Sequence, residues 1–213
     1  MLMIFDCEGV LIDSERILNQ VFRECLLTVG LDLSLEETIQ KFKGRSTNDC
    51  MHIVEMMLGR SVPAEELIAE YETWSSKRFK EEISPIPGIA KALDQLPYRR
   101  CVASSSSYEH IYLGLELTGL ITYFTEGIFS ASDVKRGKPA PDLFFHAASQ
   151  LGVAPEECIV IEDSPAGVEA AIAAGMTALG FVDLSPEIEL QSAGAKTFSN
   201  MLDLPKLVES LNA

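Results

Sequence analysis

Five nearly uninterrupted apolar runs recur along the chain of 213 residues, separated by segments with helical periodicity. The runs occupy residues 2–5, 101–103, 127–129, 158–161 and 178–182. Short segments that are apolar on both faces are typical of parallel strands covered by helices on each side. Because strand and helix alternate, the expected connections are βαβ units. The sequence therefore predicts an α/β fold with an open parallel sheet and helices on both faces.

The helix expected after the fourth run has recognisable ends. Ser164 supplies an N-cap, Pro165 takes the first helical position, and Gly175 closes a segment with apolar residues at helical spacing.

Residues 15–82 interrupt this alternation. They contain no convincing strand, but they carry helix signals such as the capping box of Ser34 and Glu37. The segment ISPIPG at 83–88 then breaks the helical pattern with two prolines and a glycine. We therefore expect a helical domain formed by residues 15–82 and an α/β core domain formed by residues 1–14 and 83–213.

The chain has a strong excess of acidic residues. Asp and Glu number 32 against 17 Lys and Arg, which gives a net charge of −15. Such a surface repels nucleic-acid phosphates and anionic lipids. We expect neither nucleic acid nor a membrane as a partner, whereas a small phosphorylated molecule can bind where local cations and amides offset the field.

The five cysteines are widely spaced and form no C-x-x-C pair, which argues against disulfides and against a zinc site. The apolar runs are far shorter than the roughly 20 residues that span a bilayer, and no leader is recognisable. These features predict a soluble cytoplasmic protein. We also expect a monomer or a weak homodimer.

Polar residues follow several of the predicted strands. Asp6 follows the first, a serine run at 104–107 the second, and Glu162 with Asp163 the fourth, while Lys138 precedes a helix. In open α/β sheets, ligands bind beyond the carboxyl ends of the strands. Each residue alone is most often a loop residue, cap or turn, but together they favour one site. Clustered carboxylates repel one another unless a cation lies among them, and oxygen ligands suit Mg²⁺.

Four segments resemble the ordered motifs of the haloacid dehalogenase superfamily. They are FDCEGVLIDSE at 5–15, ASS at 103–105, GKPAPD at 137–142 and IEDSPAG at 161–167. The likeness covers almost the whole chain. Within the superfamily, the chain is similar to the branch with a helical cap inserted after the first motif, which holds β-phosphoglucomutases and sugar-phosphate phosphatases. It implies a Rossmann-like core and a helical cap that excludes water and contacts the substrate.

The resemblance also implies a Mg²⁺ site and a covalent intermediate. Asp6 would attack phosphorus to form an aspartyl-phosphate, which water then cleaves. Asp6, the backbone carbonyl of Glu8 and Asp163 would hold the metal, with Glu162 as a further ligand or a support.

Three more residues take phosphate-binding roles in this resemblance. Ser104 and the amide of Ser105 would hold phosphoryl oxygens, and Lys138 would neutralise the charge shared by the nucleophile and the phosphate.

Glu8 departs from the family pattern, which usually has aspartate at this position. In the family, this aspartate protonates the leaving oxygen and later deprotonates the attacking water. The extra methylene of Glu8 moves the carboxyl by about one bond length, where a misplacement of roughly 1 Å can cost 10²-fold. The chain is therefore either a working, slow enzyme, a disabled variant, or a phosphate binder without turnover.

The cap offers a candidate specificity loop at residues 43–47, in which Lys43 and Arg45 would contact the substrate; a solvated turn is the alternative. Leu18 and Thr47 stand near positions where mutases of the β-phosphoglucomutase type carry histidine and arginine. None of the three histidines, His52, His110 and His146, is assigned a catalytic role. The first hypothesis is therefore a Mg²⁺-dependent phosphatase acting on a sugar or sugar acid phosphate; the alternatives are a hexose-phosphate mutase and a non-catalytic phosphometabolite binder.

Overall fold

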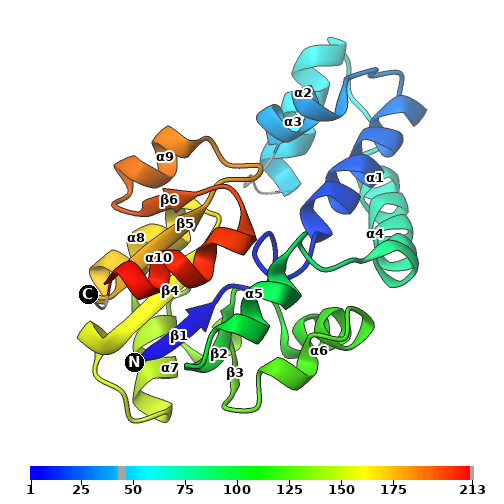
Figure 1. Ribbon diagram of the computed structural model, residues 1–213. Helices are drawn as coiled ribbons and strands as arrows, with labels where there is room; N and C mark the ends of the chain where they lie inside the picture. Colours follow the sequence, from blue (N-terminus) through cyan, green and yellow to red (C-terminus); the bar gives the residue numbers. More distant parts are fainter. Residues whose placement is uncertain (43–46, 212–213) are drawn as a thin grey trace. The chain divides into compact units, whose positions relative to one another are not determined.

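Contacts within the chain divide it into two units. One consists of Met1–Asp13 with Ser84–Ala213, and the other of Ser14–Ile83. The computed structural model describes residues 1–42 and 47–211. Its ribbon is drawn in Figure 1, in which the first unit contains the sheet and the second consists of helices.

The first unit is built on a parallel sheet of six strands in the order β3-β2-β1-β4-β5-β6. β1 lies between β2 and β4, with Phe5 opposite both Val102 and Ile161. The carboxyl ends of these three strands therefore lie side by side. The strands are β1 (Leu2–Phe5), β2 (Arg99–Ser104), β3 (Ile128–Ser130), β4 (Cys158–Glu162), β5 (Thr177–Phe181) and β6 (Lys196–Phe198).

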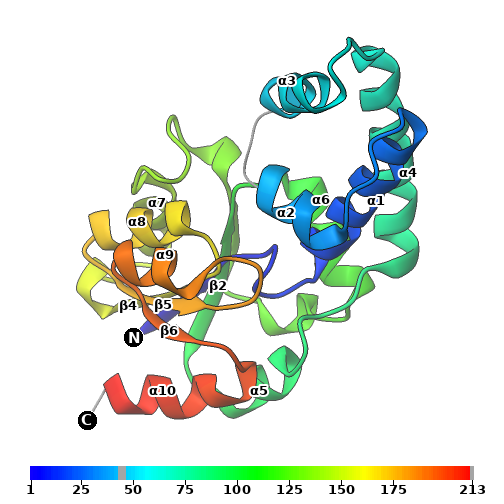
Figure 2. The same ribbon diagram turned by 90° about the horizontal axis from the view of Figure 1, so that it is seen from above.

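Helices cover both faces of the sheet (Figure 2). On one face, buried side chains of the strands such as Ile4 and Val160 pack against Phe144 and Ala171. Removal of this apolar surface from water is the main force that holds helices to sheet. The helices of this face are α7 (Asp142–Gln150), α8 (Pro165–Ala173) and α9 (Glu187–Ser192); α5 (Ile89–Gln95) and α10 (Leu204–Leu211) lie on the other, and α6 (Tyr108–Leu117) contacts β3.

The predicted α/β fold is confirmed, and each of the five apolar runs coincides or overlaps with a strand. The sixth strand, β6, is not predicted by the sequence. It has three residues, Lys196, Thr197 and Phe198, and pairs with β5 at the edge of the sheet. None of its residues is buried and two of the three are polar, so β6 lacks the apolar run that marks the other five strands.

The second unit consists of α1 (Ser14–Thr28), α2 (Leu35–Phe42), α3 (Thr47–Leu58) and α4 (Ala64–Glu82). The ring of Phe22 contacts Phe42 and Tyr71 edge to face, at centroid distances of 5.0 and 5.5 Å. The predicted capping box is confirmed, since the amide of Glu37 donates to Ser34 Oγ and the amide of Ser34 donates to Glu37 Oε2. Within residues 1–42 and 47–211, none of the helices combines the length and the apolar character needed to cross a bilayer.

Candidate active site

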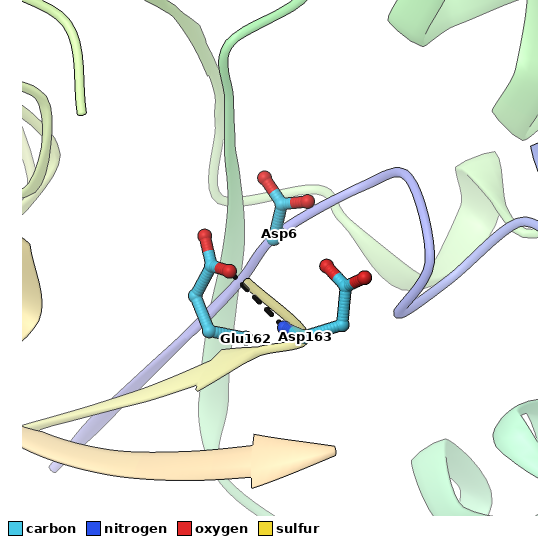
Figure 3. A group of neighbouring side chains, drawn as sticks. All are labelled: Asp6, Glu162 and Asp163. Atoms are coloured by element: carbon cyan, nitrogen blue, oxygen red, sulfur yellow. Dashed lines mark hydrogen bonds between the residues drawn. The ribbon is translucent and has the colours of Figure 1, made fainter. Parts of the chain in front are cut away.

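Three carboxylates meet where β1 and β4 end (Figure 3). Asp6 directly follows β1, Glu162 is the last residue of β4, and Asp163 comes next. One oxygen of each carboxylate lies within 4.8 Å of the others, and all three residues are buried. The amide of Asp6 donates to the carbonyl of Ile161 at 3.0 Å, which extends the pairing of the two strands up to the site.

Lys138 joins two of these carboxylates. Its Nζ donates to Asp6 Oδ1 at 2.5 Å, to Glu162 Oε1 at 2.6 Å and to the carbonyl of Ala103 at 3.1 Å. The ammonium also lies 5.1 Å from the ring centroid of Phe144. All three protons of this buried cation are therefore used, and its position relative to Asp6 is fixed by the sheet.

The proton affinities reflect this burial. Burial raises the pKa of Asp6 to about 7, since the attraction of Lys138 only partly offsets the loss of water and the repulsion of Glu162. Burial alone would lower the pKa of Lys138, but the two carboxylates hold it above its ordinary value. Lys138 is therefore a permanent positive charge beside Asp6.

Glu162 is held by hydrogen bonds on both oxygens. While Oε1 accepts from Lys138, Oε2 accepts from the amides of Asp163 and Ser164 and from Ser164 Oγ, at 2.8–3.1 Å. Ser164 Oγ in turn accepts from the amide of Gly167 as the N-cap of α8. The helix start predicted at Ser164 thus also locks the Glu162 carboxylate in one orientation.

Gly9 allows the loop after β1 to approach Asp163. Its φ is +76°, and a Cβ at this position would lie 2.4 Å from Asp163 Oδ2. Only glycine suits this combination of a left-handed backbone and a close approach.

Glu8 lies outside the cluster of three carboxylates, and its side chain has two other partners. Ser106 Oγ donates to Glu8 Oε2 at 2.9 Å, and His110 Nε2 lies 2.8 Å from Glu8 Oε1. Burial would raise the pKa of Glu8, but these contacts lower it below its ordinary value. Neither Ser106 nor His110 is predicted from the sequence as a site residue. The available signals were the position of Ser106 within the serine run and of His110 in the first turn of the next helix.

Of the remaining predicted site residues, the structure describes Ser104 and Ser105 but not Lys43 and Arg45. Ser104 ends β2, is buried, and accepts a hydrogen bond on Oγ from the amide of Ser106 at 3.2 Å. Ser105 follows at an exposed position. Lys43 and Arg45 lie outside the described residues.

The chemistry of this cluster fits a divalent cation. Within the part of the chain that the structure describes, three buried carboxylates lie close together and Lys138 contacts two of them, Asp6 and Glu162, so like charges crowd the cluster when all three are ionised. A buried excess of charge is costly unless a counter-ion is present. Carboxylate oxygens are the ligands that Mg²⁺ prefers. Because both Glu162 oxygens already accept hydrogen bonds, Glu162 is better suited to support the site than to bind the metal directly.

The chain is similar to several known proteins. The family model described as haloacid dehalogenase-like hydrolase matches residues 3–181. A 6-phosphogluconate phosphatase of Escherichia coli is 30% identical over 205 residues, which cover 96% of this chain and 93% of that protein.

Two solved structures have similar folds. A haloacid dehalogenase-like protein of unknown function from Agrobacterium tumefaciens superposes with a TM-score of 0.91 at 37% identity, covering 100% of this chain and 99% of that one. A hydrolase from Deinococcus radiodurans, solved with bound phosphate and sodium, superposes with a TM-score of 0.91 at 30% identity, covering 99% and 96%.

Proposed function

Because the chain belongs to the haloacid dehalogenase-like hydrolase family, we propose that it is a Mg²⁺-dependent phosphatase that works through an aspartyl-phosphate. The observation that carries the proposal is the buried Asp6 carboxylate, which lies 2.5 Å from Lys138 Nζ and in one cluster with Asp163. Lys138 offsets part of the charge of this carboxylate, which acts as the nucleophile once its own proton has left.

Asp6 attacks phosphorus in line as the bond to the leaving oxygen breaks. Lys138 then neutralises charge that the phosphoryl group shares with Asp6, from a position fixed by its three hydrogen bonds. Ser104 and the amide of Ser105 would hold phosphoryl oxygens at the adjacent end of β2. The water-poor surroundings of Asp6 strengthen each of these interactions.

Asp6, Asp163 and the backbone carbonyl of Glu8 would hold Mg²⁺, and Glu162 would support them through Lys138. When bound, the cation offsets the repulsion between the phosphate dianion and the carboxylates and polarises the phosphoryl group. Two anions would otherwise hardly approach each other.

Glu8 would move the protons of the reaction. It gives a proton to the leaving oxygen, and as a carboxylate it then takes a proton from the water that attacks the aspartyl-phosphate. The second step releases phosphate, regenerates Asp6 and returns Glu8 to its protonated form. The lowered pKa of Glu8 keeps its side chain ionised, as the second step requires. A bound phosphate dianion would raise this pKa and so favour the protonated form that the first step requires.

The substrate we propose is a sugar phosphate or sugar acid phosphate. The similarity to an Escherichia coli protein named 6-phosphogluconate phosphatase, over nearly the full length of both chains, supports this class. We propose that the helical unit Ser14–Ile83 is the cap over this substrate. Lys43 and Arg45 remain predictions from the sequence as its substrate contacts.

A screen of phosphorylated metabolites with Mg²⁺ tests the proposal. We expect the wild type to release inorganic phosphate from a sugar or sugar acid phosphate, and both EDTA and Asp6→Asn to abolish the release. Asp203→Asn, an exposed aspartate in the same unit, is the matched control and should be fully active. Phosphate release that survives in Asp6→Asn would overturn the assignment of the nucleophile. Dependence on a bisphosphate activator, with isomerised product, would favour a mutase.

A further inference from the structure

We propose that His110 and Ser106 are positioning residues that hold the Glu8 carboxylate for proton transfer. The inference rests on the proposed function and adds two positioning residues to the proposed active site. It explains how a glutamate can serve where an aspartate is usual.

The two oxygens of the Glu8 carboxylate are contacted by two different residues. His110 approaches Oε1 at 2.8 Å, and Ser106 donates to Oε2 at 2.9 Å. Each oxygen thus has its own partner, so the carboxylate cannot rotate or swing without breaking a contact. A glutamate side chain has one more rotatable bond than aspartate, so holding it in one conformation costs more conformational entropy. The two partners offset this cost before substrate binds.

Both partners are themselves fixed by neighbouring elements. The amide of Ser106 donates to Ser104 Oγ, and the carbonyl of Ser106 accepts from Ser130 Oγ at 2.7 Å. The amide of His110 donates to Ser107 Oγ, the N-cap of α6. The ends of β2 and β3 and the start of α6 therefore set where the Glu8 carboxylate lies.

These contacts are not needed to shape the loop that carries Glu8. Backbone hydrogen bonds already close that loop: the amides of Leu11 and Ile12 donate to the carbonyl of Cys7, and the amide of Gly9 donates to the carbonyl of Ile12. The His110 side chain is 33% exposed and contributes little to the core. Its contact with Glu8 therefore points to a role in orienting the carboxylate.

A double-mutant cycle tests the coupling between Glu8 and His110. The substrate is the alkyl phosphate that the wild type hydrolyses fastest in the screen above. We expect His110→Ala to lower kcat about tenfold or more, with little change in KM, because general acid–base assistance is worth roughly 10²–10⁴ in rate. His110→Gln, which keeps a side-chain donor, should recover part of the loss. In a Glu8→Asp background, His110→Ala should have almost no effect, since the shorter side chain does not reach His110.

The leaving group provides a readout that a purely structural role would not move. The aryl leaving group of p-nitrophenyl phosphate departs without a proton, so kcat/KM for this substrate should fall far less in His110→Ala than kcat/KM for the alkyl phosphate. Loss of folded protein would lower both equally. Glu109→Ala, an exposed residue in the same helical turn, is the matched control and should change neither.

The outcomes separate the two proposals. Absence of phosphate release by the wild type, or full activity of Asp6→Asn, contradicts the proposed function. Equal losses on both substrates, or the same loss in the wild-type and Glu8→Asp backgrounds of the cycle, contradict the positioning role alone. Crystal structures of the wild type and His110→Ala decide the role without any activity: we expect the Glu8 carboxylate to lose its single orientation, and an unchanged orientation would overturn the inference.

Discussion

Gly167 lies against the buried carboxylate of Glu162. A Cβ built at this position would be 1.8 Å from Glu162 Oε1 and 1.9 Å from Cδ, a spacing that no side chain can tolerate. In Gly167→Ala the Glu162 carboxylate must leave its four hydrogen bonds, and Lys138 loses a partner. We expect a loss of about 1–3 kcal/mol in the free energy of unfolding, as for overpacked cores, together with a loss of activity. Urea denaturation and phosphate release measure the two effects.

Gly137→Ala is the matched control for stability. The nearest atom to a Cβ at that position, beyond adjacent residues, is the Ala131 Cβ at 3.9 Å, which is an ordinary contact. It should leave the free energy of unfolding nearly unchanged. If Gly167→Ala were equally harmless, the tight packing around Glu162 would be wrong.

The proton on Asp6 should compete with Mg²⁺. Burial raises the pKa of Asp6 to about 7 in the metal-free protein. Below this pH the carboxyl holds a proton that must leave before the metal binds, and above it the carboxylate is ready. Calorimetry should therefore give Mg²⁺ affinity roughly tenfold weaker at pH 6 than at pH 8, with proton release on binding at pH 6.

A Lys138 variant tests whether the proton on Asp6 causes this pH dependence of Mg²⁺ affinity. In Lys138→Met the attraction that lowers the pKa of Asp6 is removed, so the pH at which Mg²⁺ affinity falls should move upward. Affinity that does not vary between pH 6 and pH 8 in the wild type would contradict the perturbed carboxyl.

At the scale of elements, the apolar runs could be predicted because each central strand is covered on both faces. β1 and β4 carry their own signal in the sequence, and their carboxyl ends bring Asp6 and Asp163 together once the strands are neighbours. The contact of Glu8 with Ser106 is different. It joins residues 98 positions apart, and it depends on the side-chain rotamers and on the turn after β2, which no periodicity encodes. β6 could not be predicted for a different reason: two of its three residues are polar and none is buried, so it carries no apolar run, whereas the opposite edge strand β3 does.

Within the helical unit, an ion-pair network ties α4 to α1. Arg78 donates to both oxygens of Glu24 at 2.8 and 2.9 Å and to both oxygens of Glu82 at 2.6 and 2.9 Å. Burial alone would raise the pKa of Glu24, but hydrogen bonds from Gln20 and Arg78 lower it; the hydrogen bond from Arg78 lowers the pKa of Glu82. A lowered carboxyl pKa means stabilisation that is present above the unfolded value, near 4.5, and lost as pH falls below it.

Arg78→Leu should therefore destabilise the helical unit by about 0.5–1 kcal/mol at pH 7, a value suited to partly exposed pairs, and by much less near pH 3. Trp74, the single tryptophan of the chain, packs against the core of this unit and reports its unfolding by fluorescence. Lys77→Leu removes an exposed cation of α4 outside this network and serves as the control. The same difference in stability at both pH values would show that Arg78 acts through its apolar stem and not through charge.

At the scale of the whole molecule, the net charge of −15 opposes folding through self-repulsion. The Debye length falls from about 30 Å at 0.01 M salt to about 8 Å at 0.15 M, so salt should screen repulsion between distant carboxylates far more than it weakens close pairs such as Lys138 and Asp6. With EDTA present, raising NaCl over this range should increase Tm by about 2–4 °C, which corresponds to roughly 1 kcal/mol for a chain of this size. Choline chloride, whose cation is too large for a carboxylate cluster, should give the same increase if screening is the cause. An increase with NaCl alone would instead locate the effect at the buried cluster of Asp6 and Asp163, and Asp163→Asn would then remove it.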